Sequence, residues 1–361
     1  MTHLSPAPIL GGQRCNVSRP TVIDIAREAG VSLATVDRVL NARPGVREKT
    51  ILAVNEAIAR LGYIRDMAAA NLARSRSYRM VVLLPDSDGQ FVQTLADALQ
   101  DAAVAAATVR TEMRLLRYPP EDMHALAAML ARLAEDDIAG VAVMAPETPV
   151  LRDAVRALRQ RAIPVVALVS DLPNAGCDHF IGVDSRAAGR TAGVLMGRFL
   201  GGKPKRIAVV AESMLLRDAI ERRRGFDEVL LAEFPQAEAL PTLETHGAPE
   251  ALAAGLREIL SSVEIGGVYL LGSGHRALTA ALGELGLLGK VIVIGHELTR
   301  HSRAALESRA IHAVIAQNPG HLARSTLRVL RAKADNMPID EGQEQLRIEI
   351  VLRENLPADM G

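Results

Sequence analysis

Eight short apolar runs, separated by helical stretches, constrain the fold of this 361-residue chain more than any other feature. They are MVVLLP (80–85), MRLLRY (113–118), GVAVMAP (140–146), PVVALVS (164–170), RIAVVAE (206–212), GVYLLG (267–272), VIVIGHE (291–297) and HAVIAQ (312–317). Strands that are apolar on both faces and alternate with amphipathic helices are typical of parallel sheets covered by helices on both sides. The sequence therefore predicts a doubly wound parallel α/β body.

Polar residues follow most of these runs, at the positions where the strands should end. They are Asp86 to Gln90, Glu147, Ser170, Asp171, Asp184, Ser273, Glu297 and Gln317. In doubly wound folds, ligands bind beyond the carboxyl ends of the strands. Because these side chains supply both hydrogen-bond donors and acceptors, the pattern favours a ligand that carries hydroxyl groups.

A different pattern precedes this body. Residues 21–41, TVIDIAREAGVSLATVDRVLN, read as two short helices joined by a tight turn. Thr21 and Asp24 fit a capping pair for the first helix, Gly30 supplies the turn, and Ser32 is placed to cap the second helix. The residues expected to face inward are Ile25, Ala26, Ala29, Val36, Val39 and Leu40. Those expected to face outward are Leu33, Ala34, Asp37 and Arg38.

Two helices of this size cannot bury a core alone, and the sequence supplies a third. Residues 47–63, REKTILAVNEAIARLGY, place Ile51, Val54, Ile58 and Leu61 at helical spacing, and Gly62 ends the segment. Residues 21–77 resemble the lactose-repressor (LacI/GalR) family of bacterial transcription factors, whose headpiece carries VSxxTVSRVLN where this chain has VSLATVDRVLN. The alternative is three amphipathic helices that close an unrelated domain.

The resemblance implies an all-α headpiece over residues 21–63 whose second helix reads operator DNA in the major groove. The residues it assigns to DNA contact are Thr21, Ser32, Leu33, Ala34, Thr35, Asp37, Arg38 and Asn41. Asp37 departs from the family, which has serine there. A carboxylate near phosphates is repelled unless it pairs with arginine or accepts from cytosine N4, so inherited operator contacts are in doubt.

By the same resemblance, residues 64–78 form a hinge helix that places a leucine from each subunit into the minor groove at the operator centre. Leu72 falls at this wedge position, Ala69 lies on the turn where two hinge helices would meet, and Arg74 and Arg76 are beside it for phosphates. The alternative is a flexible linker. Because two hinges act together, the resemblance implies a homodimer on a near-palindromic operator.

Charge is distributed unevenly although the whole chain has a net charge of zero. Residues 1–77 hold eleven Lys or Arg against six Asp or Glu, and the remainder holds 31 against 36. A basic end and an acidic body suit a protein that contacts phosphates only at one end. The first twenty residues are expected to form a disordered arm.

The cysteine count and the hydropathy of the chain indicate which compartment and which kinds of site to expect. Cys15 and Cys177 are too few and too far apart to predict a disulfide framework or a metal cluster, so neither metal nor cofactor is expected. No apolar run approaches the ~20 residues that span a bilayer, and the N-terminus lacks a secretory core. We expect a cytoplasmic protein without membrane contact.

The α/β body resembles the type I periplasmic sugar-binding proteins, above all the ribose-binding kind, over residues 79–355. The carrying motifs are GVDSRAAGR (182–190), RRRGF (222–226), IGHELT (294–299) and IAQNPG (315–320). The resemblance implies two lobes, each with a doubly wound parallel sheet and a ligand cleft between them. Lobe one would comprise about 79–183 and 318–337, and lobe two about 184–317 and 343–355.

The resemblance also implies effector-binding positions. Arg222 and Gln317 match the ribose-type pattern, whereas Glu297 stands for an aspartate and Ser273 for an asparagine. Residues 169–171 stand where the family has an Asp-Arg pair, which weakens any claim for ribose itself. The full effector set is Asp88, Phe91, Ser170, Asp171, Asp184, Arg222, Ser273, Glu297 and Gln317.

Other interpretations of these residues stay open. Each polar one could simply cap a loop, and an arginine could clamp a carboxylate or phosphate instead of a sugar. Phe91 is the best candidate to stack on a sugar, with Phe180 and Tyr118 as possible partners, and Phe226 is expected in the core.

The sequence disfavours an enzyme because its near-matches to catalytic motifs lack required residues or spacing. His296, Glu297 and His301 miss the spacing of a zinc-protease helix, and neither a phosphate loop nor a G-x-S-x-G elbow is present. The sequence thus predicts a ligand-responsive transcription factor, a repressor in type, that binds operator DNA and a small sugar-like effector. The alternative is a cytoplasmic binding module whose headpiece no longer regulates.

Overall fold

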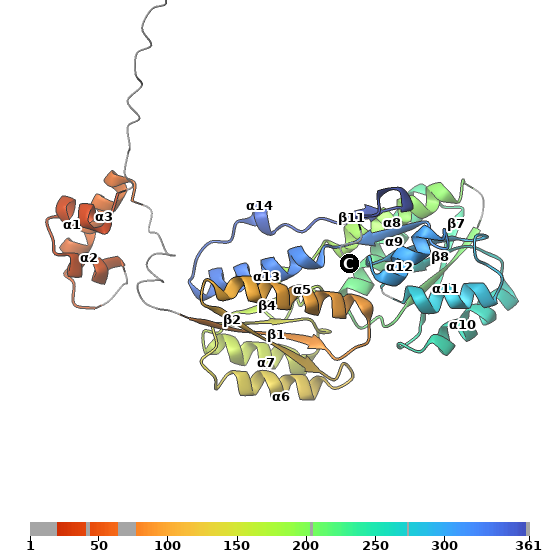
Figure 1. Ribbon diagram of the computed structural model, residues 1–361, viewed down its shortest axis with the longest axis horizontal. Coiled ribbons are helices and arrows are strands. Elements are labelled where there is room, and N and C mark those ends of the chain that lie inside the picture. Colours follow the sequence, from red (N-terminus) through yellow and green to blue (C-terminus); the bar gives the residue numbers. More distant parts are fainter. Residues whose placement is uncertain (1–19, 41–43, 64–76, 203–204, 273, 359–361) are drawn as a thin grey trace, which may run out of the picture. The chain divides into compact units, whose positions relative to one another are not determined.

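The computed structural model describes residues 20–40, 44–63, 77–202, 205–272 and 274–358. The chain divides into two compact units, Met1–Arg76 and Ser77–Gly361 (Figure 1). The predicted N-terminal arm and nearly all of the predicted hinge helix lie outside the described residues.

The first unit contains three helices, α1 (Val22–Ala29), α2 (Leu33–Leu40) and α3 (Glu48–Leu61). Their core is built on side chains with almost no exposed surface, namely Ile25, Ala26, Val36, Val54 and Ala57. The predicted inward residues Ala29, Val39 and Leu40 pack around it. Ile51 differs from the prediction because it is 37% exposed, and Ala57, three residues after the buried Val54, is in the core instead.

The second unit contains two sheets, each the centre of one lobe. The sheet of lobe one has the order β2 (Thr111–Tyr118), β1 (Tyr78–Pro85), β3 (Gly140–Val143), β4 (Val165–Leu168) and β5 (His179–Ile181). All of its neighbouring strands are parallel. The sheet of lobe two has the order β11 (Glu349–Val351), β10 (Ala313–Ala316), β9 (Ile292–His296), β8 (Ile265–Leu270), β6 (Lys205–Ala211) and β7 (Ala237–Glu244).

Helices cover both faces of the sheet in lobe one. Figure 1 shows α5 (Gln90–Ala107) and α13 (Pro319–Ala334) on one face, and α6 (Met123–Leu133) and α7 (Pro149–Gln160) on the other. Strand β1 shows why both faces are apolar: Met80 and Val82 face the α5–α13 side, and Val81 and Leu83 face the α6–α7 side, all almost fully buried.

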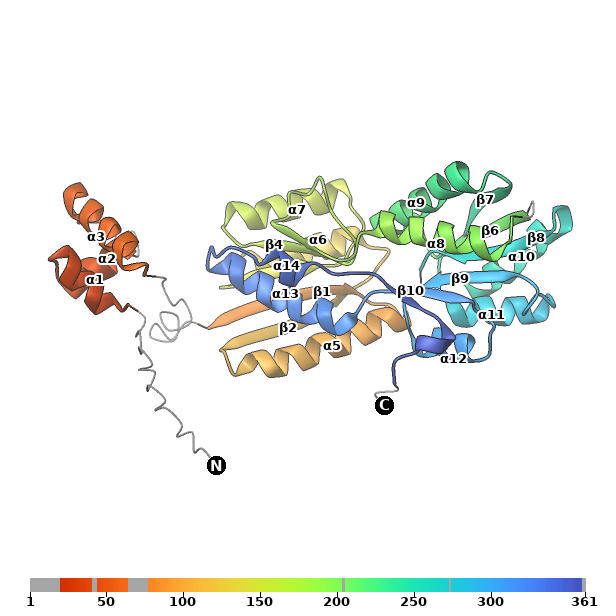
Figure 2. The same ribbon diagram turned by 90° about the horizontal axis from the view of Figure 1, so that it is seen from above.

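The sheet of lobe two is covered in the same manner. One face packs against α8 (Ser185–Phe199) and α9 (Arg217–Glu233), which lie side by side in Figures 1 and 2. The other face packs against α10 (Pro249–Ser262), α11 (His275–Glu284) and α12 (Arg300–Glu307). The predicted doubly wound α/β architecture with two lobes is confirmed.

Each of the eight apolar runs forms a strand, β1 to β4, β6 and β8 to β10. The chain passes between the sheets three times: between β5 and α8, between β10 and α13, and between the short α14 (Glu341–Glu344) and β11. One difference from an all-parallel sheet is the edge strand β11, which pairs antiparallel with β10. Within the described part of the chain, none of the helices combines the length and apolar character needed to cross a bilayer.

Candidate functional site

The helix-turn-helix geometry follows from local chemistry in residues 21–35. The backbone N–H and the hydroxyl of Thr21 donate to the Asp24 carboxylate at 2.8 and 2.7 Å, which fixes the start of α1. Gly30 ends α1 in the left-handed conformation, with φ of 65°. The Ser32 hydroxyl accepts from the Thr35 N–H at 3.2 Å and so caps α2, as predicted.

Helix α2 presents a solvent-facing surface. Leu33 is 50% exposed, and Ala34, Asp37 and Arg38 are also exposed, while Thr35 is half-buried beside them. An exposed leucine on a short helix that already has a core is not required for folding of the unit. This face is therefore available to a partner. The other residues predicted to contact DNA, Asn41, Ala69 and Leu72, lie outside the described residues.

In the second unit, a cavity of about 210 Å³ lies at the carboxyl ends of the strands, between the two lobes. Its apolar lining includes Phe91, Tyr118, Met144, Val169 and Leu271. Its charged lining consists of Glu212, Asp218, Arg222 and Glu297. Of the residues predicted for the effector, the structure thus brings Phe91, Arg222 and Glu297 together in one cleft.

Arg222 is the centre of a buried charged cluster. It is 3% exposed, and one of its terminal nitrogens, Nη2, donates to Glu297 Oε1 at 2.8 Å. The other, Nη1, donates to the Leu271 carbonyl at 2.8 Å and lies 3.5 Å from Asp218 Oδ2. Gln317, also buried, donates to Glu297 Oε1 at 3.0 Å. The cluster joins α9 to the ends of β8, β9 and β10.

The pKa values in this cluster reflect burial and pairing. Burial raises the pKa of Glu297, and the nearby Arg222 offsets part of that rise. Burial lowers the pKa of Arg222, but the charges of Glu297 and Asp218 outweigh it, so the net shift is upward. Arg222 therefore stays cationic.

The cluster leaves several hydrogen-bonding atoms unused. In the described part of the chain, buried atoms without a partner include Asp218 Oδ1, Arg222 Nε, Glu297 Oε2 and Gln317 Oε1. Buried polar atoms are normally paired, and an unpaired one costs about 1–3 kcal/mol. Four such atoms in one cluster beside a cavity indicate a site that is completed by a ligand or by water.

Backbone strain marks the same site. Val169, after β4, and Glu297, after β9, are non-glycine residues with φ of 65° and 69°. A positive φ is unusual for any residue with a side chain and is a true outlier for a β-branched valine. Such strain concentrates at functional sites, and both of these residues line the cleft.

Close packing of α8 against α9 fixes the position of Arg222. A Cβ placed on Gly189 would lie 2.0 Å from the Arg222 carbonyl oxygen, and one on Gly225 would lie 2.1 Å from the Arg186 carbonyl oxygen. Only glycine permits this approach of the two backbones. Helix α8 begins at Ser185, directly after the first crossover, so the packing ties the guanidinium to the junction of the lobes.

The remaining predicted effector residues lie elsewhere. Asp88 is exposed and does not line the interlobe cleft. Ser170 is fully buried, and its hydroxyl accepts from the Arg217 N–H across the lobes at 3.1 Å. Asp184 accepts from the Ala187 N–H at 2.8 Å and so caps α8. Ser273 lies outside the described residues.

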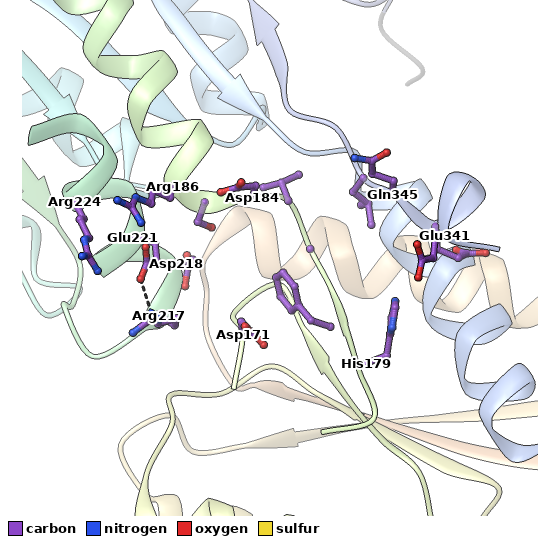
Figure 3. A pocket seen from close by; sticks show the side chains of 16 residues that line it. Asp171, His179, Asp184, Arg186, Arg217, Asp218, Glu221, Arg224, Glu341 and Gln345 are labelled. Carbon is purple, nitrogen blue, oxygen red and sulfur yellow. Dashed lines mark ion pairs between the residues drawn. The ribbon is translucent and has the colours of Figure 1, made fainter. Parts of the chain in front are cut away.

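Asp171 and Asp184 line a second, more open cavity of about 660 Å³. Figure 3 shows it between the side chains of α8 and α9 and those near the last crossover. Its labelled residues are Asp171, His179, Asp184, Arg186, Arg217, Asp218, Glu221, Arg224, Glu341 and Gln345. Several of its charges are satisfied within the protein, including the pair between Arg217 and Glu221.

Asp218 is the functional candidate that the sequence interpretation missed. It lines both cavities, and its side chain is 11% exposed. It follows no apolar run, because it lies in the first turn of α9, one helical turn before Arg222. The signal that could have found it is this i, i+4 spacing, which places both side chains on one helix face.

A helix-turn-helix unit followed by a two-lobed α/β unit with an interlobe cleft defines the class of DNA-binding proteins that carry a ligand-binding body. Comparison with known families agrees. Residues 80–337 match the family described as periplasmic binding protein domain, and residues 17–66 match bacterial regulatory proteins, lacI family. The chain belongs to the periplasmic binding protein domain family and carries a lacI-family DNA-binding domain before it.

Similarity to an individual curated relative covers a smaller part of the chain than the family match does. Catabolite control protein A from Priestia megaterium is 32% identical over 150 residues, which is 42% of this chain and 43% of that protein. The chain thus matches less than half the length of this curated relative.

Two solved structures share the fold of the second unit. A solute-binding protein from Burkholderia graminis C4D1M, in complex with D-arabinose, has a TM-score of 0.70 at 19% identity and covers 78% of this chain and 98% of its own. GanP, a glucose-galactose binding protein from Geobacillus stearothermophilus, has a TM-score of 0.69 at 16% identity, covering 78% and 99%.

Proposed function

We propose that this protein is a transcriptional regulator, a repressor in type, whose affinity for operator DNA is controlled by a small ligand in the interlobe cleft. The observation that carries the proposal is the pairing of two features in one chain. Helix α2 has an exposed face that folding does not require, and the cleft contains a buried cluster with four unsatisfied polar atoms. A DNA-binding domain of the lacI family supports duplex DNA as the partner of the first feature.

The proposed effector is a small hydroxylated molecule such as a sugar. The buried cluster has three unpaired oxygen acceptors and one N–H donor, and three of these four atoms belong to residues that line the cleft together with Phe91 and Tyr118. Hydroxyl groups both donate and accept, so they can satisfy both kinds of atom, and an aromatic surface suits the apolar face of a sugar ring. Binding of D-arabinose by a protein of the same fold is consistent with this class.

The proposed residues divide between two surfaces. On DNA, Ser32 and Thr21 position the helices, and Leu33, Ala34, Asp37 and Arg38 face the groove. In the cleft, Arg222, Glu297 and Gln317 form the polar end of the site, and Phe91 forms part of its apolar wall. We assign no catalytic residue and no cofactor, and we place the protein in the cytoplasm.

A homodimer is part of the proposal. A groove between α5 and α13 is lined by the apolar residues Ala98, Ala102, Ala105 and Leu327 and by the charged residues Asp101, Arg324 and Arg328. On the adjacent part of α5, Val104 is 75% exposed. Small apolar residues flanked by opposite charges form a surface that a second copy can complement by two-fold symmetry.

Selection of randomised duplex DNA by the full-length protein at near-physiological salt tests the proposal. A near-palindromic motif with a flexible central step is expected for two headpieces and two hinges. Leu72→Ala should then weaken operator binding far more than ligand binding. Failure to enrich any motif would favour the alternative, a binding module without regulatory DNA contact.

A further inference from the structure

The charges in the interlobe cleft are unbalanced. Among the described residues that line it, three carboxylates, those of Glu212, Asp218 and Glu297, stand against one guanidinium, that of Arg222. Arg222 is committed to protein partners through both terminal nitrogens. It therefore has little capacity left to bind an anionic ligand, which argues against the carboxylate or phosphate that an arginine in such a cleft could otherwise hold.

The buried unpaired atoms of the cluster are also mostly hydrogen-bond acceptors. Three of the four are acceptors, Asp218 Oδ1, Glu297 Oε2 and Gln317 Oε1, and two of these belong to carboxylates. A carboxylate oxygen only accepts hydrogen bonds when it is ionised. A donor that also carries positive charge would complement these carboxylate oxygens best, because it forms the stronger, charge-assisted hydrogen bonds.

An organic cation supplies a positively charged hydrogen-bond donor to this cleft better than a metal ion does. In the described part of the chain, no group of three or more His, Cys, Asp or Glu side chains is arranged to hold a metal. The cleft is instead lined by apolar and aromatic groups beside the carboxylates, including Phe91 and Tyr118. Aromatic faces also attract a cationic amine.

We infer that the effector is a small polyhydroxylated amine, of the chemical class of the amino sugars, rather than a neutral or an anionic sugar. This inference rests on the proposed function, since it names the ligand class of the same cleft. The ammonium group binds near Asp218 and Glu297, where it offers up to three N–H donors and balances the excess negative charge. A hydroxyl group satisfies the remaining unpaired donor of the lining, Arg222 Nε.

The expected preference follows from the strength of charge-assisted hydrogen bonds. An ammonium group that donates to Asp218 or Glu297 puts a charge on both partners, whereas a hydroxyl in its place leaves only the carboxylate charged. An amine should therefore bind about 10-fold more tightly than the neutral analogue of the same stereochemistry.

Binding to the full-length protein, measured by thermal shift and calorimetry in the absence of DNA, tests the inference. The probes are matched sets: glucosamine, galactosamine and mannosamine; glucose, galactose and mannose; glucuronate and galacturonate; and glucose 6-phosphate, together with a wider library of small amines and polyols. Binding confined to amines, or at least 10-fold tighter for them, is expected. Tighter binding of neutral or anionic members, or no binding in any class, overturns the inference.

Variants locate the preference. Asp218→Asn and Glu297→Gln should each reduce the ratio of amine affinity to neutral-sugar affinity. Glu212→Gln should also reduce this ratio, and it leaves the buried cluster intact because Glu212 is an exposed carboxylate of the same cleft. Glu264→Gln is the control because that carboxylate is exposed and pairs with Lys205 away from the cleft. An unchanged ratio in all three cleft variants overturns the assignment.

The same probes separate this inference from the proposed function. An amine that binds in the cleft but leaves operator affinity unchanged contradicts the regulatory role and supports the ligand class. A neutral sugar that binds more tightly and releases operator DNA supports the regulatory role and overturns the ligand class.

Discussion

Replacing Arg222 with methionine should destabilise the ligand-binding unit strongly. The substitution keeps a long apolar side chain but removes the hydrogen bonds to Glu297 and to the Leu271 carbonyl, and the ion pair with Asp218. Glu297 would still accept the hydrogen bond from Gln317. Removing one partner of a buried ion pair costs about 3–5 kcal/mol, because the other charge is left uncompensated. We expect a loss of that size in the free energy of unfolding at pH 8.

The loss should depend on pH in a direction set by Glu297. Burial raises the pKa of this carboxyl above its usual 4.5, and Arg222 opposes the rise. Without Arg222 the folded-state pKa rises further. A carboxyl with a raised folded-state pKa binds its proton more tightly in the folded protein, so its stabilising effect is present at low pH and is lost as pH rises above about 4.5. Arg222→Met should therefore be closer to wild type at pH 5 than at pH 8.

Urea denaturation of the full-length protein at the two pH values measures both effects. Arg257→Met is the matched control, because Arg257 forms an exposed pair with Glu284 at 3.1 Å and its loss should cost about 0–1 kcal/mol. Adding Glu297→Gln to Arg222→Met removes the uncompensated charge and should restore about 1.5–3 kcal/mol at pH 8. A loss that is equal at both pH values, with no restoration in the double variant, would refute the argument.

Three further predictions address the other elements. Arg38→Ala should weaken binding to an operator and reduce the slope of log affinity against log salt by about 1 if Arg38 contacts a phosphate, as measured by titration at several salt concentrations. Gly189→Ala should cost about 1–3 kcal/mol or more in unfolding free energy, since its Cβ would lie 2.0 Å from the Arg222 carbonyl oxygen; a neutral result in denaturation would contradict the helix packing. Ser170→Ala removes a hydrogen bond between lobes and should change operator affinity in ligand-free protein, as measured by fluorescence anisotropy.

The fold was largely predictable because most of its strands carry a continuous apolar run, and the central ones, such as β3, β4 and β8, are buried on both faces. Continuous runs such as 80–85 leave no polar face that could be mistaken for a helix or a loop. The two strands that escaped prediction lack such a run. Strand β5 has three residues, and β7 is a half-exposed edge strand that contains Pro241, so neither carries a continuous apolar run.

The candidate site was only partly predictable. The rule that ligands bind at strand ends led to Glu297 and Gln317, and their contact with each other and with Arg222 is present in the structure. The same rule also selected Asp184, which the structure shows as a helix cap. Position after a strand does not specify where a side chain points, and it cannot detect a residue such as Asp218 whose role arises from a helix.

Two hydrogen bonds between the lobes suggest how occupancy of the cleft can reach the rest of the protein. The Arg217 N–H donates to Ser170 Oγ, and the His301 N–H donates to Gln90 Oε1, both at 3.1 Å. Each donor belongs to the first turn of a helix in lobe two, where backbone N–H groups have no partner within the helix, and each acceptor belongs to lobe one. Arg217 also lies one residue before Asp218, so a ligand that moves Asp218 also moves this donor. A ligand can change operator affinity only if it binds two lobe arrangements unequally, and these two hydrogen bonds are contacts that hold the lobes in the arrangement seen in this structure.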